Sequence, residues 1–195
     1  MMLVDAFSTR SVLVQDPRIG RIGIAGWSLG GTVALYSAWS PIIDILGSAF
    51  DAHLPFYPAA HIRPVIQNWS KSSILILHGD IDDWTPLHFV EGLTPQLPNA
   101  TLHVYPGAHH SFDSEKEFTL LPKAVHLRNR TARIDKNGYM SGELFLGIRL
   151  PLNERWQRRL IIRILRNRGA HVEGNPTARA DSLVRARDFF VEQLS

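Results

Sequence analysis

A glycine-rich turn between an apolar run and a helical pattern constrains the fold most. Residues 21–25, Arg-Ile-Gly-Ile-Ala, form a short apolar run that predicts a buried strand. Residues 26–31, Gly-Trp-Ser-Leu-Gly-Gly, follow directly, and residues 32–38 then predict a helix that Pro41 stops. A strand, a tight turn and a helix in direct succession are the start of an α/β unit. We therefore expect a mostly parallel sheet flanked by helices.

Four further segments extend this α/β pattern. Residues 73–77 are continuously apolar, as in a parallel strand buried on both faces, and residues 101–105 alternate like a strand before Pro106-Gly107. A short helix is expected after Pro86. The last helix begins at Asn175 as N-cap and Pro176 as first helical residue, and its apolar positions recur every three to four residues.

Length and composition limit the class of protein. The 195 residues suit a single domain, 1–195, and 45% of them are hydrophobic, as in a globular protein. No apolar run approaches the roughly 20 residues of a membrane-spanning helix, so integral membrane association is excluded. The chain has no cysteine, which excludes disulfides and a cysteine nucleophile. Because no signal peptide opens the sequence, we expect a cytoplasmic protein.

Charge is concentrated in one segment, from about residue 123 to 168. Lys123 to Arg168 holds 12 Lys or Arg against 3 Asp or Glu, whereas the whole chain has a net charge of +3. We interpret this segment as an insertion before the terminal helix, with a hairpin at Asn137-Gly138 and a basic helix at 155–168. That helix is either a solvated basic face or an amphipathic surface for an anionic partner. No nucleic-acid-binding motif accompanies it, so we expect no nucleic-acid partner.

The turn itself has the spacing of a nucleophile elbow, Gly26-x-Ser28-x-Gly30. Such a turn is so tight that side chains at the flanking positions would clash with the neighbouring strand and helix. In return, the Ser28 hydroxyl projects above the sheet, and the backbone N–H of Leu29 points into the same space. The alternative is a glycine-rich turn without catalysis.

Two of the predicted strands place polar residues at the same edge of the sheet. Asp82 shares a loop with two further aspartates after the strand at 73–77, and His109 and His110 follow the strand at 101–105. The order of serine, acid and histidine is the order of the catalytic residues in the α/β-hydrolase fold. Neither H-E-x-x-H nor a similar ligand spacing occurs, so we expect neither metal nor cofactor.

At these three sites the sequence resembles the dienelactone hydrolase family. Residues 26–31, 77–86 and 105–112 look like that family's catalytic blocks, and residues 169–178 look like its closing stretch. The resemblance selects Asp82 over Asp83 and His110 over His109. It covers residues 17–112 and 169–194. The archetypal member uses cysteine as nucleophile, whereas this chain has Ser28.

The resemblance implies an α/β-hydrolase fold and hydrolysis of a small-molecule carboxylic ester or lactone through an acyl-enzyme. Ser28 would attack the carbonyl, His110 would transfer the proton, and Asp82 would orient the histidine. The Leu29 N–H would bind the oxyanion. Candidates to line the acyl pocket are Trp27, Trp84 and Phe112, for each of which core packing is the alternative.

The start of the chain departs from the family pattern. Only about 25 residues precede the elbow, enough for one strand and a turn, so the chain looks truncated at the N-terminus, with family strands and the second oxyanion donor missing. We expect the exposed sheet edge to favour a homodimer. The rival hypothesis is a non-catalytic or impaired fragment that acts as a binding module through its basic segment.

Overall fold

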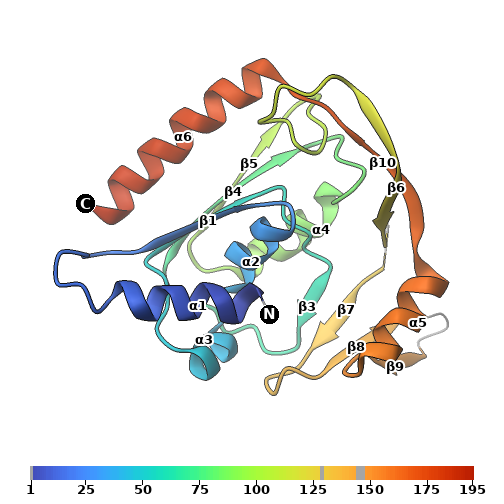
Figure 1. Cartoon of the computed structure of the whole chain (residues 1–195), viewed down its shortest axis with the longest axis horizontal. Coiled ribbons are helices and arrows are strands. Elements are labelled where there is room, and N and C mark those ends of the chain that lie inside the picture. The colour runs from blue at the N-terminus through green and yellow to red at the C-terminus, as the bar shows by residue number, and fades with distance from the viewer. Residues whose placement is uncertain (1, 128–129, 144–147) are drawn as a thin grey trace.

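The computed structural model describes residues 2–127, 130–143 and 148–195. Its main sheet is parallel and has the strand order β1-β2-β4-β5. The strands are β1 (Gly23–Trp27), β2 (Ala52–Phe56), β4 (Ser73–Gly79) and β5 (Ala100–Tyr105). All four strands run in the same direction, so the loops after them meet at one edge of the sheet (Figure 1).

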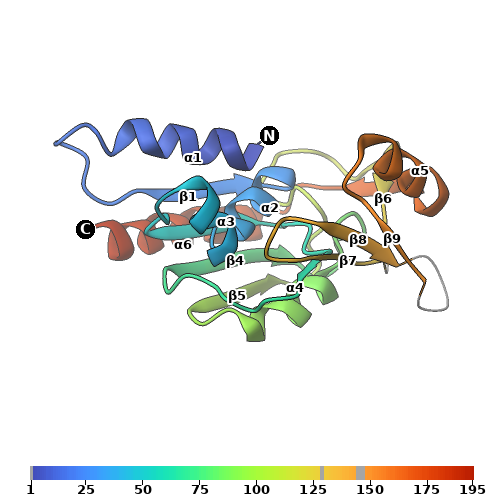
Figure 2. The ribbon, with the colours of Figure 1, turned by 90° about the horizontal axis from the view of Figure 1, so that it is seen from below.

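Helices cover both faces of this sheet, which is the α/β arrangement expected from the sequence (Figures 1 and 2). On one face, α2 (Leu29–Tyr36) and α4 (Leu87–Leu93) pack with Ile74 and Ile76 of β4. On the other face, α6 (Pro176–Leu194) packs on Leu54, Leu75 and Leu77. The one-turn 3-10 helix η1 (Thr94–Gln96) joins α4 to β5. None of the described helices is both long and apolar enough to cross a membrane.

The predicted strand before the elbow is present as β1, but the first 50 residues also contain two helices that the sequence did not predict. A helix, α1 (Met2–Leu13), precedes β1, and its Phe7 packs against Ile22 and Phe50. Pro41 does not simply end the helix after the turn. It occupies the first turn of a further helix, α3 (Ser40–Leu46), where a missing N–H costs nothing.

Strand β2 has no counterpart among the sequence-based predictions, although all five of its residues are buried. The composition of β2 is not typical of a buried strand, because Pro55 has no N–H to donate to a neighbouring strand and His53 is polar. The register with β1 pairs Gly26 with Pro55 and Trp27 with Phe56. This strand therefore lies directly beside the glycine-rich turn.

The basic segment forms a second layer of small sheets. A two-stranded antiparallel sheet joins β6 (Thr119–His126) to β10 (Asn167–Val172). A four-stranded sheet has the order β3-β7-β8-β9, with β3 (Ile62–Pro64), β7 (Ala132–Ile134), β8 (Met140–Glu143) and β9 (Arg149–Pro151). Figure 2 shows this layer at the end of the molecule opposite the C-terminus.

The structure confirms one local prediction in this segment and corrects another. Strands β7 and β8 pair antiparallel around the predicted turn, where Gly138 has φ +82°. The basic helix α5 (Arg155–Leu165) is shorter than the predicted 155–168, because Asn167 and Arg168 already belong to β10. Residues 128–129 and 144–147 of the predicted insertion lie outside the described residues.

Candidate active site

Ser28 lies at a sharp turn between the end of β1 and the start of α2. Its backbone has φ 53° and ψ −113°, a strained positive-φ conformation that costs a non-glycine residue energy. The Ser28 N–H donates to the Phe56 carbonyl at 3.0 Å, and its own carbonyl accepts the Thr32 N–H at 2.9 Å. These bonds hold the strained turn between β2 and the first turn of α2.

Two of the three glycines around Ser28 are sterically required. A Cβ on Gly26 would lie 2.2 Å from the Gly30 carbonyl oxygen, and one on Gly31 would lie 2.4 Å from the Phe56 carbonyl oxygen. A Cβ on Gly30 would meet nothing within 4 Å. The expected clash at both flanking positions is therefore wrong for Gly30, and Gly31 is the glycine that allows α2 to approach β2.

A continuous chain of hydrogen bonds joins the three predicted catalytic side chains. His110 Nε2 lies 2.9 Å from Ser28 Oγ, and His110 Nδ1 lies 2.7 Å from Asp82 Oδ2. An ionised carboxylate can only accept, so Nδ1 carries the proton and Nε2 of the neutral ring accepts from the serine hydroxyl. His110 is 1% exposed and Asp82 is 4% exposed, so bulk water hardly competes for these bonds.

Asp82 is held by more than the histidine. Its Oδ1 accepts the backbone N–H groups of Trp84 and Thr85 at 2.9 and 2.8 Å, and its Oδ2 accepts the Thr85 hydroxyl at 2.8 Å. Burial acts to raise the pKa of Asp82, but the hydrogen bonds and charge of His110 outweigh it, and the pKa is lowered. The carboxylate is thus ionised and fixed in orientation. Sequence reasoning missed the part that Thr85 plays here.

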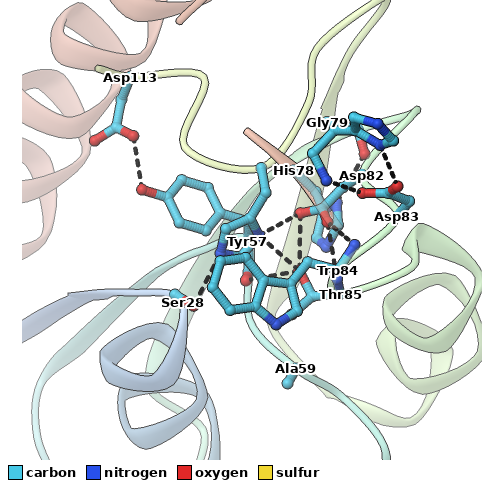
Figure 3. Close-up of polar contacts among 12 residues, drawn as sticks. Ser28, Tyr57, Ala59, His78, Gly79, Asp82, Asp83, Trp84, Thr85 and Asp113 are labelled. Atoms are coloured by element: carbon cyan, nitrogen blue, oxygen red, sulfur yellow. Dashed lines mark hydrogen bonds and ion pairs between the residues drawn. The ribbon is translucent and has the colours of Figure 1, made fainter. Parts of the chain in front are cut away.

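The neighbouring acids and histidine have other partners. Asp83 lies on the far side of the cluster from Ser28 (Figure 3), and its Oδ2 is 2.8 Å from Nδ1 of His171. Asp80 accepts the Gly107 N–H at 2.7 Å. His109 Nε2 lies 3.8 Å from a carboxylate oxygen of Glu173. Among these residues, only Asp82 and His110 form a chain to Ser28.

Tyr57 is a further site residue that the sequence did not reveal, because it follows the unrecognised β2. Its ring centroid lies 4.5 Å from that of His110, and its hydroxyl donates to Asp113 Oδ1 at 2.7 Å (Figure 3). Burial is the main cause that raises the pKa of Tyr57 above its ordinary value. A neutral phenol therefore packs beside the imidazole and fixes one side of it.

The loop that carries His110 is anchored by the segment after β10. Val172 forms a parallel bridge with His110, and the Glu173 N–H donates to the His110 carbonyl at 3.2 Å. The Asn175 N–H donates to the Phe112 carbonyl at 2.8 Å, while its side chain caps α6 through the Ala178 N–H. The basic segment ends at β10, so its fold and the position of His110 are physically coupled.

Ser28 opens into a cavity of about 350 Å³. One wall is Trp84, whose ring lies 4.8 Å from His110 and whose Nε1–H donates to the Val125 carbonyl at 3.1 Å. Another wall is Val125, His126 and Leu127, at the end of β6. The basic segment thus supplies part of this cavity.

The other two predicted pocket residues do not line it. Phe112 is 0% exposed and packs in the core with Phe56 and Tyr105, which corrects its assignment to the pocket. Trp27 is 49% exposed and stacks on Phe56 at 5.1 Å, outside the cavity wall. Trp27 follows Gly26 on the strand, and successive residues of a strand point to opposite faces of the sheet.

The backbone N–H of Leu29 remains the candidate oxyanion donor. Leu29 is the first residue of α2, where N–H groups have no carbonyl partner within the helix.

No group of three or more His, Asp or Glu side chains that could hold a metal ion occurs in the described part of the chain.

Comparison with known proteins places the chain in a family. No curated protein matches it significantly. Among solved structures, Est1E from Butyrivibrio proteoclasticus is 17% identical with a TM-score of 0.44, and the match covers 57% of this chain and 62% of that one. Esterase PE8 is 26% identical with a TM-score of 0.36, and the match covers 45% of this chain and 41% of that one. Esterase 2 of Thermogutta terrifontis is 18% identical with a TM-score of 0.38, covering 45% of each chain.

The chain therefore spans less than two thirds of the length of these structures. Their similarity is accompanied by a match to a sequence family over a longer stretch. The sequence model of the dienelactone hydrolase family matches residues 2–135, more than half of the chain and all of the Ser28, Asp82 and His110 loops, so this chain belongs to the dienelactone hydrolase family.

Proposed function

We propose that the protein is a serine hydrolase that cleaves a carboxylic ester or lactone of a small molecule through an acyl-enzyme. The observation that carries this proposal is the buried hydrogen-bond chain from Ser28 through His110 to Asp82. The esterases among the similar solved structures agree with this reaction class.

In the first half of the reaction, Ser28 Oγ attacks the substrate carbonyl carbon. His110 Nε2 takes the hydroxyl proton, and the resulting imidazolium is stabilised by the ionised Asp82 on Nδ1. The carbonyl oxygen becomes an oxyanion and accepts the Leu29 N–H. As the tetrahedral intermediate collapses, His110 returns the proton to the leaving alkoxide, and an acyl-Ser28 ester remains.

In the second half, water replaces the alcohol beside His110. His110 Nε2 takes a proton from this water, which attacks the acyl carbon and forms a second tetrahedral intermediate. Collapse releases the carboxylic acid and returns the proton to Ser28 Oγ. Thr85 and Tyr57 keep the imidazole and its acid in one geometry through both halves.

A fluorophosphonate probe tests this proposal, because it phosphonylates only an activated serine. We expect stoichiometric labelling of the protein and none of Ser28→Ala, with Ser114→Ala as control because Ser114 lies outside the site. Labelling that survives in Ser28→Ala, or folded wild-type protein that is not labelled, would contradict the assignment.

We propose a second function for α5, the binding of an anionic lipid surface. Trp156, Leu160 and Ile164 follow one another at every fourth position and are 64%, 44% and 57% exposed. Beside them run Arg155, Arg159 and Arg163, all exposed. An exposed apolar row next to a row of arginines suits the boundary between acidic headgroups and acyl chains.

Vesicle sedimentation tests this second proposal. We expect binding to vesicles containing phosphatidylserine and little to pure phosphatidylcholine. The triple variant Arg155→Gln, Arg159→Gln and Arg163→Gln should bind less. The control is a matched triple Arg→Gln variant on α6, which should bind these vesicles as the wild type does, because the arginines it replaces already pair with carboxylates. The replaced residues are Arg179, Arg185 and Arg187. Equal losses in the two variants would mean that only net charge matters.

A further inference from the structure

A second cavity adjoins the one at Ser28. It measures about 410 Å³ and lies along α2, on the side of α1 and of the β7–β8 hairpin. The two cavities share Leu29, Thr32 and Ile62 as lining residues. In Figure 1 the N-terminal end of α1 and strand β3 lie near α2, and β7 lies beyond β3. A groove therefore leads from the serine, past the start of α2, to the hairpin of the basic segment.

The polar side chains in the walls of this groove offer a ligand no free hydrogen-bond donor. The Tyr36 hydroxyl donates to the Ile62 carbonyl, and the Trp39 Nε1–H donates to the Ile66 carbonyl at 2.9 Å. The Thr32 hydroxyl donates to the Ser28 carbonyl at 3.2 Å and accepts the Ala59 N–H at 2.9 Å. The other lining side chains are aliphatic or thioether, and none of the lining residues is charged. Such a surface suits a hydrocarbon chain and not a sugar, a phosphate or a carboxylate.

The reacting geometry decides which part of an ester enters the groove. The leaving oxygen must lie within hydrogen-bond reach of His110 Nε2, next to the Trp84 wall. His110 lines neither cavity, and the groove leaves Ser28 past Leu29 and Thr32, at the start of α2. The alcohol therefore departs on the Trp84 side, and the acyl chain extends along α2.

From these observations we infer that the groove is the acyl-chain subsite and that the substrates are esters of unbranched, medium-length fatty acids. This inference rests on the proposed function of Ser28. It also gives the hairpin of the basic segment a role, because Ile134 of β7 and Met140 of β8 close the far end of the groove.

Kinetics with p-nitrophenyl acetate and p-nitrophenyl octanoate test the inference. Burial of each methylene is favourable, so kcat/KM for octanoate should exceed that for acetate by about tenfold or more. Val33→Trp, on the groove side of α2, should lower kcat/KM for octanoate about tenfold more than for acetate. Val191→Trp makes the same change at an exposed position of α6 and should leave the ratio as in the wild type.

Met140→Phe approaches the groove from the opposite wall and covers the case in which Val33→Trp does not fold. It should lower the octanoate-to-acetate ratio in the same direction. A ratio that is equal in the wild type, Met140→Phe and Val191→Trp would overturn the inference, as would a wild type that prefers acetate.

Calorimetric titration of Ser28→Ala with octanoate separates failure of this inference from failure of the proposed function. Suppose that no ester is turned over, but that octanoate binds Ser28→Ala and does not bind the double variant Ser28→Ala, Val33→Trp. The groove assignment is then supported, and the proposed reaction is contradicted. If esters are turned over but octanoate does not bind and chain length has no effect, the groove assignment falls alone.

Discussion

At the scale of single residues, two adjacent aspartates provide a sharp test of the site. Asp82 fixes His110 Nδ1 inside the protein, whereas Asp83 pairs with the partly exposed His171. Asp82→Asn should lower kcat roughly 10⁴-fold, because the amide can no longer select the tautomer in which Nε2 accepts the serine proton. Asp83→Asn removes one exposed pair and should cost less than about tenfold. Steady-state kinetics on a single ester checks both variants, and equal losses would show that the wrong acid has been assigned.

A buried histidine away from the site makes stability depend on pH. His53 is 0% exposed on β2, with Nδ1 2.9 Å from the Ala34 carbonyl, and burial lowers its pKa to about 4 from 6.5. Because the folded state disfavours the protonated ring, His53 supports stability above about pH 6.5, and this support is lost as the pH falls towards 4. The shift corresponds to about 3 kcal/mol.

Urea unfolding at pH 7 and pH 4.5 measures this effect. The free energy of unfolding of the wild type should fall more than that of His53→Asn, which cannot titrate there. The exposed His88→Asn is the control and should follow the wild type. The prediction fails if His53→Asn loses as much stability on acidification as the wild type does.

The main residues of the candidate site could be predicted from sequence, and its supporting residues could not. Ser28, Asp82 and His110 each follow a recognisable strand, and glycine or aspartate patterns mark their loops. Thr85 and Tyr57 carry no such pattern, since the role of Thr85 comes from its hydrogen bond to Asp82 and that of Tyr57 from a contact with His110 across 53 residues. The geometry of the loops, and not the residue type, assigns them to the site.

At the scale of elements, the glycines of the turn set how closely α2 approaches β2. Gly31→Ala would place a Cβ 2.4 Å from the Phe56 carbonyl oxygen, and this clash can be relieved only if the backbone shifts. Thermal and urea unfolding should show a loss of about 2 kcal/mol or more. Gly30→Ala enters open space within a helix and should be neutral or stabilise by up to about 1 kcal/mol. Similar losses for both variants would show that the packing at Gly31 does not limit stability.

Prediction of the elements depended on how strongly each one displays its period. Strand β4 is a continuous apolar run and α6 has both a cap and a stripe, so both were evident. Strand β2 could not be recognised because it contains Pro55 and His53. The strand nevertheless pairs with β1, and His53 Nδ1 is within hydrogen-bond distance of Ser37 and of the Ala34 carbonyl. Helix α1 was hidden because its apolar residues do not line one face, and four of them remain exposed: Met2, Val4, Val12 and Leu13. Tertiary packing determines the secondary structure of such segments, and the local sequence pattern carries no information about that packing.

At the scale of the whole molecule, the basic segment and the sheet domain form one unit around the site. Strand β3 of the body pairs with β7, β6 supplies a cavity wall, and β10 holds the His110 loop. A change in the segment should therefore reach the site. The charge count distinguishes residues 123–168 from the rest of the chain and so predicts an insertion. It cannot predict the contacts of this segment with the site, because those depend on strand pairing with the sheet domain.

The last prediction concerns the edge of the main sheet at β1. No described strand pairs with the outer side of β1, where Ala25 and Trp27 are exposed. Unpaired backbone N–H and C=O groups at a sheet edge favour pairing with another chain, and a lysine on the edge strand opposes it. We therefore expect the protein to form a homodimer that Ala25→Lys dissociates. Thr101→Lys makes the same charge change at the other edge strand, β5, and should leave the dimer intact. Multi-angle light scattering across a concentration series measures the mass. A monomeric wild type, or dissociation by Thr101→Lys and not by Ala25→Lys, would exclude β1 as the interface.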